Sequence, residues 1–341
     1  MTIIAALLLF GVIILIHEFG HFIFAKKNGI TVHEFAIGMG PKLFGKEKNG
    51  TLYSIRLLPI GGYVSMEGED EESNKPGSFG TKSILQRASV IFAGPFFNLV
   101  LAVIFLIPVF IYIGSPTTTL ENITDNSPAY EANLKSGDTI KSIDGKEINS
   151  WNEFTQAISS SNGRELNLVV ERDNKMVKVN VTPEKSEDGS YKVGVTCARD
   201  KNIINAIKDS FTTTGQMIVQ MVTFLKQMIT GTVPGGLTNS VAGPVGVISL
   251  VSDAARTGII NLLYLGSIIS LNLGIINLVP FPALDGGRLL LLFIEWIRGG
   301  KKINPDKEAM INMIGFCALM AFMLFITYND VTKLFKGIIK F

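Results

Sequence analysis

The stretch "ALLLFGVIILIHEFGHFIFAKKNG", residues 6–29, joins a long apolar run to three ionisable side chains near its end. Crossing a bilayer takes about 20 apolar residues, and this run is long enough. His17, Glu18 and His21 nevertheless fall inside it. Ionisable groups within a membrane span are costly and usually functional. The stretch therefore predicts a membrane helix that carries a reactive site.

The composition of the whole chain agrees with a membrane protein. Its 341 residues have a mean hydropathy of +0.35. Only 18% of them are charged, against about a quarter in soluble domains. The net charge of +2, without a basic cluster, gives no indication of a nucleic-acid partner. The two cysteines, Cys197 and Cys317, lie in very different segments and predict no disulfide framework.

Four apolar runs qualify as transmembrane helices, at roughly residues 3–25, 84–113, 259–279 and 310–328. The first run lacks a preceding basic region and a cleavage site, so we expect a retained span rather than a signal peptide. Lys and Arg are concentrated between the first and second runs and between the third and fourth. Both loops are therefore expected in the cytoplasm, with residues 114–258 outside. The tail departs from this rule, because it carries Lys333, Lys336 and Lys340 yet is placed outside.

The first cytoplasmic segment is too polar to span the membrane. "TLYSIRLLPIGGYV", residues 51–64, has the β-branched and aromatic content of a strand. We expect a membrane-associated β-hairpin layer here, either re-entrant or interfacial, since irregular backbone at membrane depth has to be buried or face water. The acidic stretch "EGEDEESNKPGS", residues 67–78, is expected to be a mobile loop.

Residues 116–196 have the composition of a soluble α+β domain. "LNLVVERDNKMVKVNV", residues 166–181, predicts a hairpin with a turn at Asp173–Asn174. The order of elements resembles a PDZ domain, and "SPAYEANLKSGDTIKSIDG", residues 127–145, resembles the bacterial protease-associated kind. An amphipathic helix at 203–230 and a Gly/Pro-rich connection, "GTVPGGLTNSVAGPVGVISL" at 231–250, are expected to follow.

The segment "HEFGH" fits the H-E-x-x-H pattern. On a helix His17 and His21 share one face and can bind one metal ion, while Glu18 can reach a water on that metal. Zinc suits two imidazoles and a carboxylate with one position left for water. Such five-residue matches also occur by chance in soluble helices, and a structural histidine pair is the alternative. The third histidine, His33, is expected to be an ordinary surface or interface residue.

Asp285 is the candidate for the third ligand. It is the only acidic residue between Asp253 and Glu295, and it follows Pro280 and Pro282, which interrupt the third apolar run. Prolines let the chain turn, which could direct the carboxylate at the metal. The alternative is a turn or helix-capping residue, a common role for Asp before Gly-Gly.

These motifs together resemble the site-2 protease family of intramembrane zinc metalloproteases, in its bacterial branch that cleaves anti-sigma factors and remnant signal peptides. The resemblance rests on the first-span HEFGH, "NLVPFPALDGG" at 277–287 and the PDZ-like insert, and it covers nearly the whole chain. Family members often carry two PDZ domains, whereas this sequence has room for one. The resemblance implies Zn²⁺ as cofactor, the lipid bilayer as surroundings, and single-span membrane proteins trimmed by an upstream site-1-type protease as substrates.

The resemblance also implies residue roles. His17, His21 and Asp285 would bind zinc and Glu18 would be the catalytic base; the residues implied to hold the unwound substrate are Asn277, Pro282, Gly61, Gly62 and Tyr63, the last three within the "LPIGGYV" β-loop. Asn98 matches a family position near the active site, with a structural role between spans as the alternative. The PDZ-like domain would screen substrates, or else bind free C-termini.

The chain is therefore expected to be a four-span α-helical membrane protein of the cell membrane with its active site near the cytoplasmic side. We divide it into residues 1–115 and 259–341, the two halves of a protease core, 116–198, the extracytoplasmic PDZ-like domain, and 199–258, the helix and connection. A metal transporter and an inactive scaffold are the competing functions. Transport needs no base beside the ligands, and transporters often have internal repeats, which we do not detect.

Overall fold

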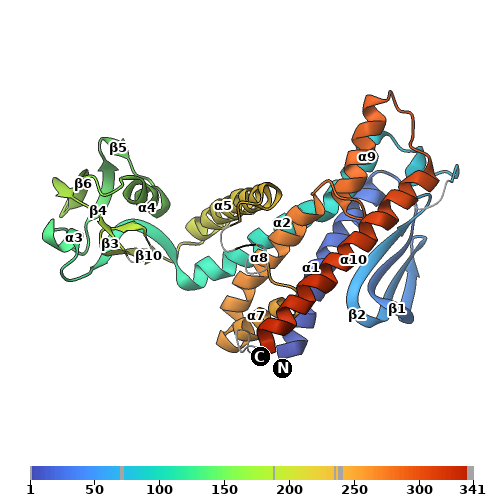
Figure 1. Cartoon of the computed structure of the whole chain (residues 1–341), viewed down its shortest axis with the longest axis horizontal. Coiled ribbons are helices and arrows are strands. Elements are labelled where there is room, and N and C mark those ends of the chain that lie inside the picture. The colour runs from blue at the N-terminus through green and yellow to red at the C-terminus, as the bar shows by residue number, and fades with distance from the viewer. Residues whose placement is uncertain (1, 70–72, 187–188, 234–235, 237–240, 336–341) are drawn as a thin grey trace. The chain divides into compact units, whose positions relative to one another are not determined.

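The computed structural model describes residues 2–69, 73–186, 189–233, 236 and 241–335. It divides the chain into two compact units, which are described separately (Figure 1). The first unit comprises Met1–Val109 and Ser210–Phe341, and the second comprises Phe110–Asp209. The predicted positively charged end of the tail, with Lys336 and Lys340, lies outside the described residues.

Four helices of the described chain are long and apolar enough to cross a membrane. They agree with the four predicted apolar runs, because a helix satisfies the backbone hydrogen bonds of an apolar run within the run itself. The second run is interrupted by Pro95 and Pro108, yet α2 is continuous through both. The four helices are α1 (Thr2–Lys27), α2 (Ile84–Ile113), α8 (Ile259–Asn277) and α10 (Pro305–Phe335).

A further helix, α7 (Pro244–Thr257), packs against α1, α8 and α10. The Gly/Pro-rich connection predicted for residues 231–250 is wrong from Pro244 onward: Pro244 occupies the first turn of a helix, where its missing N–H costs nothing. Val251 of α7 is buried beside Ile13 of α1. The start of α7 is capped by Asp330 of α10, whose carboxylate accepts a hydrogen bond from the Gly246 amide at 2.8 Å.

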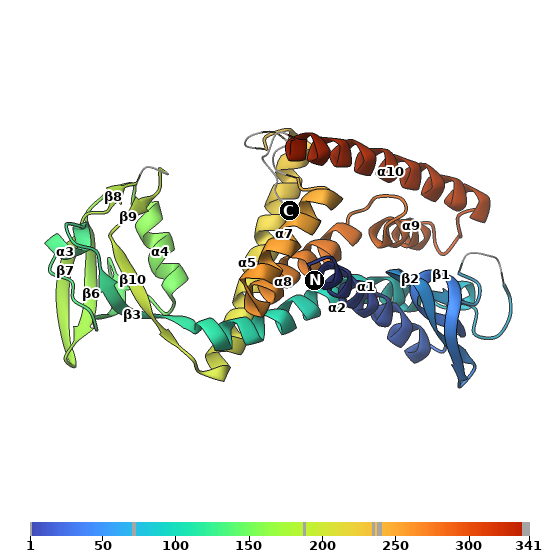
Figure 2. The same ribbon diagram turned by 90° about the horizontal axis from the view of Figure 1, so that it is seen from below.

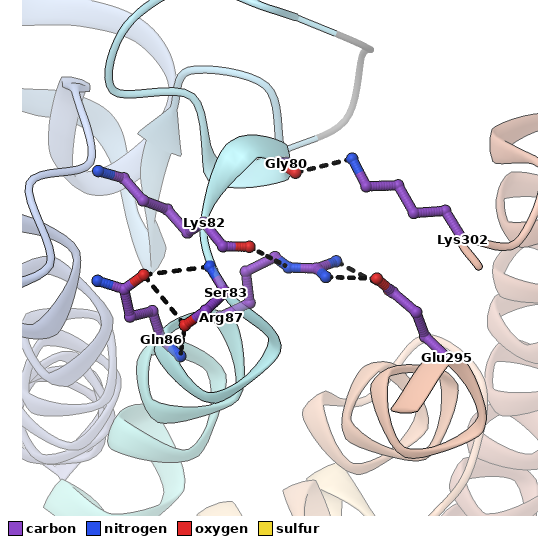
Figure 3. A network of polar contacts seen from close by, with 7 residues as sticks. All are labelled: Gly80, Lys82, Ser83, Gln86, Arg87, Glu295 and Lys302. Atoms are coloured by element: carbon purple, nitrogen blue, oxygen red, sulfur yellow. Dashed lines mark hydrogen bonds and ion pairs between the residues drawn. The ribbon is translucent and has the colours of Figure 1, made fainter. Parts of the chain in front are cut away.

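Helix α9 (Asp285–Ile297), which the sequence analysis did not predict, is joined to the start of α2 by a buried ion pair (Figure 3). The Arg87 guanidinium donates to both carboxylate oxygens of Glu295, at 3.0 and 2.6 Å. Each side chain of this pair is 8% exposed. Nearby, the Lys302 ammonium donates to the Gly80 carbonyl in the 3-10 turn Phe79–Thr81. These contacts link the element that carries Asp285 to α2.

The predicted β-hairpin consists of two long strands, β1 (Val32–Lys48) and β2 (Thr51–Met66). β1 and β2 pair in two registers: Ala36 of β1 has Ser54 of β2 opposite it on one side and Tyr63 of β2 opposite it on the other. Residues 32–37 are therefore flanked by two segments of β2, 52–55 on one side and 62–66 on the other. Glycines at positive φ in β1 and β2 allow this folding back of each strand. The hairpin lies next to α1 (Figure 1).

The second unit is an α+β domain, as predicted. Its main sheet has the order β10-β3-β4-β6-β7, with β5 paired to β4. Figure 2 shows strands β3, β6, β7 and β10 of this unit. Leu120, Ile140, Phe154 and Leu168 belong to its buried core. The elements are β3 (Ser115–Ile123), α3 (Pro128–Glu131), β4 (Thr139–Ile143), β5 (Lys146–Glu147), α4 (Trp151–Ser160), β6 (Leu166–Arg172), β7 (Lys175–Val181), β8 (Glu184–Lys185), β9 (Tyr191–Lys192) and β10 (Val195–Asp200). The next helix, α5 (Ile203–Thr230), begins in this unit and belongs to the first unit from Ser210 onward.

The predicted hairpin of this unit is confirmed. β6 and β7 form a hairpin in which Arg172 pairs with Lys175, so that Asp173 and Asn174 make the turn with positive φ angles of 49° and 58°. The turn before β4 is held by Asp138, which is 1% exposed and accepts two hydrogen bonds from Arg172 at 2.7 Å. Burial alone would raise the pKa of Asp138, but the bonds from Arg172 and the Lys135 amide lower it below its usual value.

Candidate active site

Helix α1 presents its two histidines on one face, one turn apart, as the sequence spacing predicts. Their Nε2 atoms lie 3.2 Å apart, and the two rings meet edge-on with centroids 4.8 Å apart. His17 is buried, with 8% exposure, and His21 is partly buried. Two ring nitrogens at this distance cannot both carry a proton: they either share one in a hydrogen bond or direct both lone pairs at one cation.

Asp285 reaches the same point from the start of α9. Its Oδ2 lies 3.2 Å from Nε2 of His17 and 3.6 Å from Nε2 of His21. The preceding turn places Ala283 at a positive φ of 73°, a conformation that side-chain-bearing residues rarely adopt. Strained backbone of this kind is concentrated at functional sites. The prediction that Pro280 and Pro282 interrupt the third span agrees with this geometry, because α8 ends at Asn277.

These three ligand atoms fit a zinc ion. They all lie within 4.8 Å of one another. Zinc bonds to nitrogen and oxygen of about 2.0–2.2 Å imply tetrahedral ligand separations of about 3.3–3.6 Å, close to the distances found. Asp285 Oδ2 is buried and has no hydrogen-bond partner in the described part of the chain. A buried acceptor without a donor is costly, and a cation at this point would remove that cost.

The ring of His21 is oriented by α2. Its Nδ1 lies 2.9 Å from the Val90 carbonyl, which can only accept, so Nδ1 carries the proton and Nε2 is left with a lone pair. Gly94 lies one turn further along α2, and a Cβ there would overlap the His21 imidazole. Only glycine leaves room for the ring. Val90 has no signal in the sequence, since a backbone carbonyl has no residue signature.

The ring of His17 is oriented by Asn98, which is fully buried in α2. The Asn98 amide nitrogen lies 3.1 Å from His17 Nδ1, while its Oδ1 has no partner in the described residues. The orientation of an amide side chain is assigned from its hydrogen bonds. With the Asn98 amide turned over, Oδ1 takes the place of the nitrogen and accepts a hydrogen bond from His17 Nδ1–H. His17 Nε2 is then free to bind a metal, as for His21.

Glu18 lies on α1 beside the β-hairpin. A Cβ built on Gly62 would lie 3.4 Å from Glu18 Cγ and 2.8 Å from the Ala36 carbonyl, so the strand approaches the carboxylate closely because Gly62 has no side chain. Gly61, the preceding residue, has a positive φ of 83°. The structure therefore brings Gly62 of the predicted β-loop next to the helix that carries the HEFGH motif, with Gly61 directly before it in the chain.

The remaining predicted residues are less directly placed. Asn277 ends α8, and Pro282 lies in the turn before α9, where a Cβ on Gly315 of α10 would overlap it. His33 is exposed and lies 2.9 Å from a Glu67 oxygen, which agrees with its prediction as a surface residue. Glu67 and Glu69 of the acidic loop are described, and Glu69 pairs with Arg288 of α9, but residues 70–72 lie outside the described residues.

Comparisons with known proteins agree with this geometry. The family model described as Peptidase family M50 matches residues 5–322. The chain is 35% identical to the Regulator of sigma-W protease RasP of Bacillus subtilis, over 98% of this chain and 99% of that protein. It is also 35% identical to the Zinc metalloprotease RasP of Bacillus licheniformis, with the same coverage. Among solved structures, the PDZ domain of an SdrC-like protein from Listeria monocytogenes matches 25% of this chain and 87% of that domain, at 24% identity and a TM-score of 0.22.

The family match extends over both halves of the membrane part and includes the HEFGH and LDGG segments. The predicted metalloprotease activity and zinc cofactor are therefore confirmed at the level of the family. Together with the four apolar helices, the match identifies a multi-pass membrane protein. The chain belongs to peptidase family M50, the site-2 protease family.

Proposed function

We propose that this chain is a zinc endopeptidase that cleaves transmembrane segments of single-span proteins within the membrane. The observation that carries the proposal is the convergence of His17, His21 and Asp285 beside Glu18, inside a bundle of apolar helices. Two imidazoles and one carboxylate leave a fourth position for water, the arrangement typical of catalytic rather than structural zinc sites. A bound Zn²⁺ would supply Lewis acidity, lowering the pKa of a water and polarising the scissile carbonyl.

The chain's own residues would do the rest. His17 and His21 would hold the ion through Nε2, with Asn98 and the Val90 carbonyl fixing the two rings. Glu18 follows the first ligand directly and would accept a proton from the attacking water and deliver it to the leaving amine. A transporter would need no base at this position, so the presence of Glu18 supports hydrolysis.

The substrate would bind in an extended form beside the hairpin. Peptide bonds in a helix are shielded, and addition to a sheet edge holds a peptide open. The segment 62–66 lies on the outer side of residues 32–37, next to Glu18. We propose that Gly61, Gly62 and Tyr63 present this edge, and that Asn277 and Pro282, which flank the turn leading to Asp285, hold the other side of the unwound segment.

The substrates proposed are anti-sigma factors and remnant signal peptides that an upstream site-1-type protease has already shortened. The name of the Bacillus subtilis relative, a regulator of sigma-W, supports the first class. We further propose that the PDZ-like domain lies outside the cell membrane and screens substrates there, and that the active site lies near the cytoplasmic side. The Lys- and Arg-rich loops support this orientation.

The test compares wild type with Glu18→Gln in detergent, with a single-span substrate, scoring cleavage and bound zinc separately. Loss of cleavage with zinc retained is the expected result, because the amide keeps the size of the carboxylate but cannot accept the proton. Glu165→Gln, an exposed position in the second unit, is the matched control. Undiminished cleavage by Glu18→Gln would refute the assigned mechanism. Absence of cleavage in both proteins would favour a transporter or scaffold.

A further inference from the structure

The polar face of the β-hairpin carries a network centred on one carboxylate. Glu34 accepts hydrogen bonds from the Ser54 hydroxyl at 2.5 Å and from the Tyr63 hydroxyl at 2.7 Å. The Arg56 guanidinium donates to both of its oxygens, at 2.8 and 2.9 Å. We call these four residues the Glu34 network. It joins three neighbouring segments of the sheet, because Glu34 lies in β1 and its partners lie in two different parts of β2.

Arg56 closes the network. Its second terminal nitrogen donates to the Gly40 carbonyl at 2.7 Å, and its guanidinium lies 5.1 Å from the centroid of the Tyr63 ring. A planar guanidinium that is bidentate to a carboxylate and stacked on an aromatic ring fixes the geometry of both partners. Tyr63 is therefore held at its hydroxyl by Glu34 and at its ring by Arg56.

The charges of the network are matched, so it persists over the physiological pH range. Burial alone would raise the pKa of Glu34, but the hydrogen bonds from Ser54, Tyr63 and Arg56 lower it below its usual value. Burial and the bond to Glu34 raise the pKa of Tyr63 to about 12. Glu34 thus remains an anion and Tyr63 a neutral donor.

Tyr63 is next to the segment that touches the HEFGH motif. Gly62 approaches Glu18 so closely that an added Cβ would lie 3.4 Å from Glu18 Cγ. Tyr63 itself lies opposite Ala36, and Glu34 shares the face of Ala36 because alternate residues of a strand point the same way. A hydrogen bond from Tyr63 to Glu34 therefore acts along the strand and opposes sliding of 62–66 past 32–37.

Such a restraint is needed here. Gly61 and Gly62 contribute no side chains that could lock the register, and Gly-rich strands are prone to register slippage. A slip of one residue would turn Tyr63 to the opposite face, so the alternative register that preserves the faces differs by two residues. The Glu34 network favours the observed register, because its hydrogen bond from Tyr63 to Glu34 joins residues that are diagonal neighbours in that register.

From this arrangement we infer that Glu34, Arg56 and Tyr63 are positioning residues that fix the height of segment 62–66 beside Glu18. They thereby determine which peptide bond of an added substrate strand is cut. The inference rests on the proposed function, since it requires the substrate to pair with this edge. The cleavage position is then determined by the side chains of the Glu34 network and not by the zinc ligands.

The experiment maps cleavage positions by mass spectrometry on a single-span substrate, using full-length protein with its zinc content measured. Tyr63→Phe keeps the ring and removes the bond to Glu34. We expect about a five-fold increase in the share of product cut two residues from the main position, equivalent to losing one hydrogen bond of about 1 kcal/mol. Glu34→Gln should broaden the cuts further, because it also weakens the bidentate contact with Arg56.

Tyr53→Phe is the matched control, since Tyr53 lies in the same sheet, packs its ring on Phe22 and Phe35, and takes no part in the network. It should leave the cleavage pattern unchanged. If Tyr63→Phe and Glu34→Gln lower total cleavage but keep a single cut position, the network only stabilises the sheet and the inference is overturned. Unchanged rate and pattern in both variants would overturn it as well. Failure of the proposed function looks different, because wild type itself would then cleave nothing.

Discussion

Replacing Asn98 by leucine tests how the structure prepares His17 for the metal. Leucine has a similar size but no hydrogen-bonding group, so His17 Nδ1 loses its only described side-chain partner. Asn98 is 0% exposed and His17 is 8% exposed, so water has no room to replace the lost group. The effect should therefore fall on metal affinity first and on the fold second.

The magnitude follows from that burial. Partners of metal-bound histidines typically contribute 10- to 100-fold to metal affinity, which corresponds to about 1.4–2.8 kcal/mol. Because no water can enter, we expect a loss near the upper end of this range. Asn98→Asp should lose less, since a carboxylate oxygen can still accept from Nδ1–H.

Zinc affinity is measured by competition with a chromophoric chelator in detergent, which needs no substrate. Ser267→Ala is the control, because Ser267 is equally buried, lies in α8 and donates only to the Tyr264 carbonyl. It should bind zinc as wild type does. Wild-type zinc affinity in Asn98→Leu, with normal folding, would refute the idea that Asn98 orients His17.

Three other predictions concern packing and charge. Gly94→Ala should abolish zinc binding while α2 stays helical by circular dichroism, because its Cβ would overlap the His21 imidazole. Retained zinc binding would contradict this packing. Arg87→Met should lower stability by about 3–5 kcal/mol by leaving Glu295 buried without a partner, and adding Glu295→Leu should restore most of the melting temperature; equal melting of the single and double variants would contradict this. The lowered pKa of Asp138 means that its stabilising contribution is complete above the unfolded value of about 3.9 and is lost as the pH falls below it. Asp138→Asn should remove this acid sensitivity from the melting curve of the second unit. An unchanged acid sensitivity would mean that other titratable groups cause it.

The membrane helices and the metal motif could be predicted from the sequence because each is encoded locally. A run such as 84–113 leaves no alternative to a helix in lipid, even with two prolines. The spacing of His17 and His21 determines a shared helix face before any fold is known. Asp285 could be predicted as a ligand because acidic residues are scarce in the sequence around it, which is also a local property.

The features that the sequence analysis missed depend on distant segments. Helices α7 and α9 are short, begin at Pro or Asp beside glycines, and look like connections until their faces are packed. The carbonyl of Val90 and the space at Gly94 acquire meaning only when α2 lies against α1. The Glu34 network requires two registers of one hairpin, which alternation along a single strand does not reveal.

The proposed zinc ligands come from opposite ends of the chain, two from α1 and one from the start of α9. During synthesis, which proceeds at about 5–20 residues per second, the histidines are made roughly 10–50 s before Asp285 emerges. Throughout that interval the nascent protein already has Glu18 and both imidazoles but cannot complete a three-ligand site. The order of the sequence thus delays completion of the proposed three-ligand site until the third apolar helix has been made.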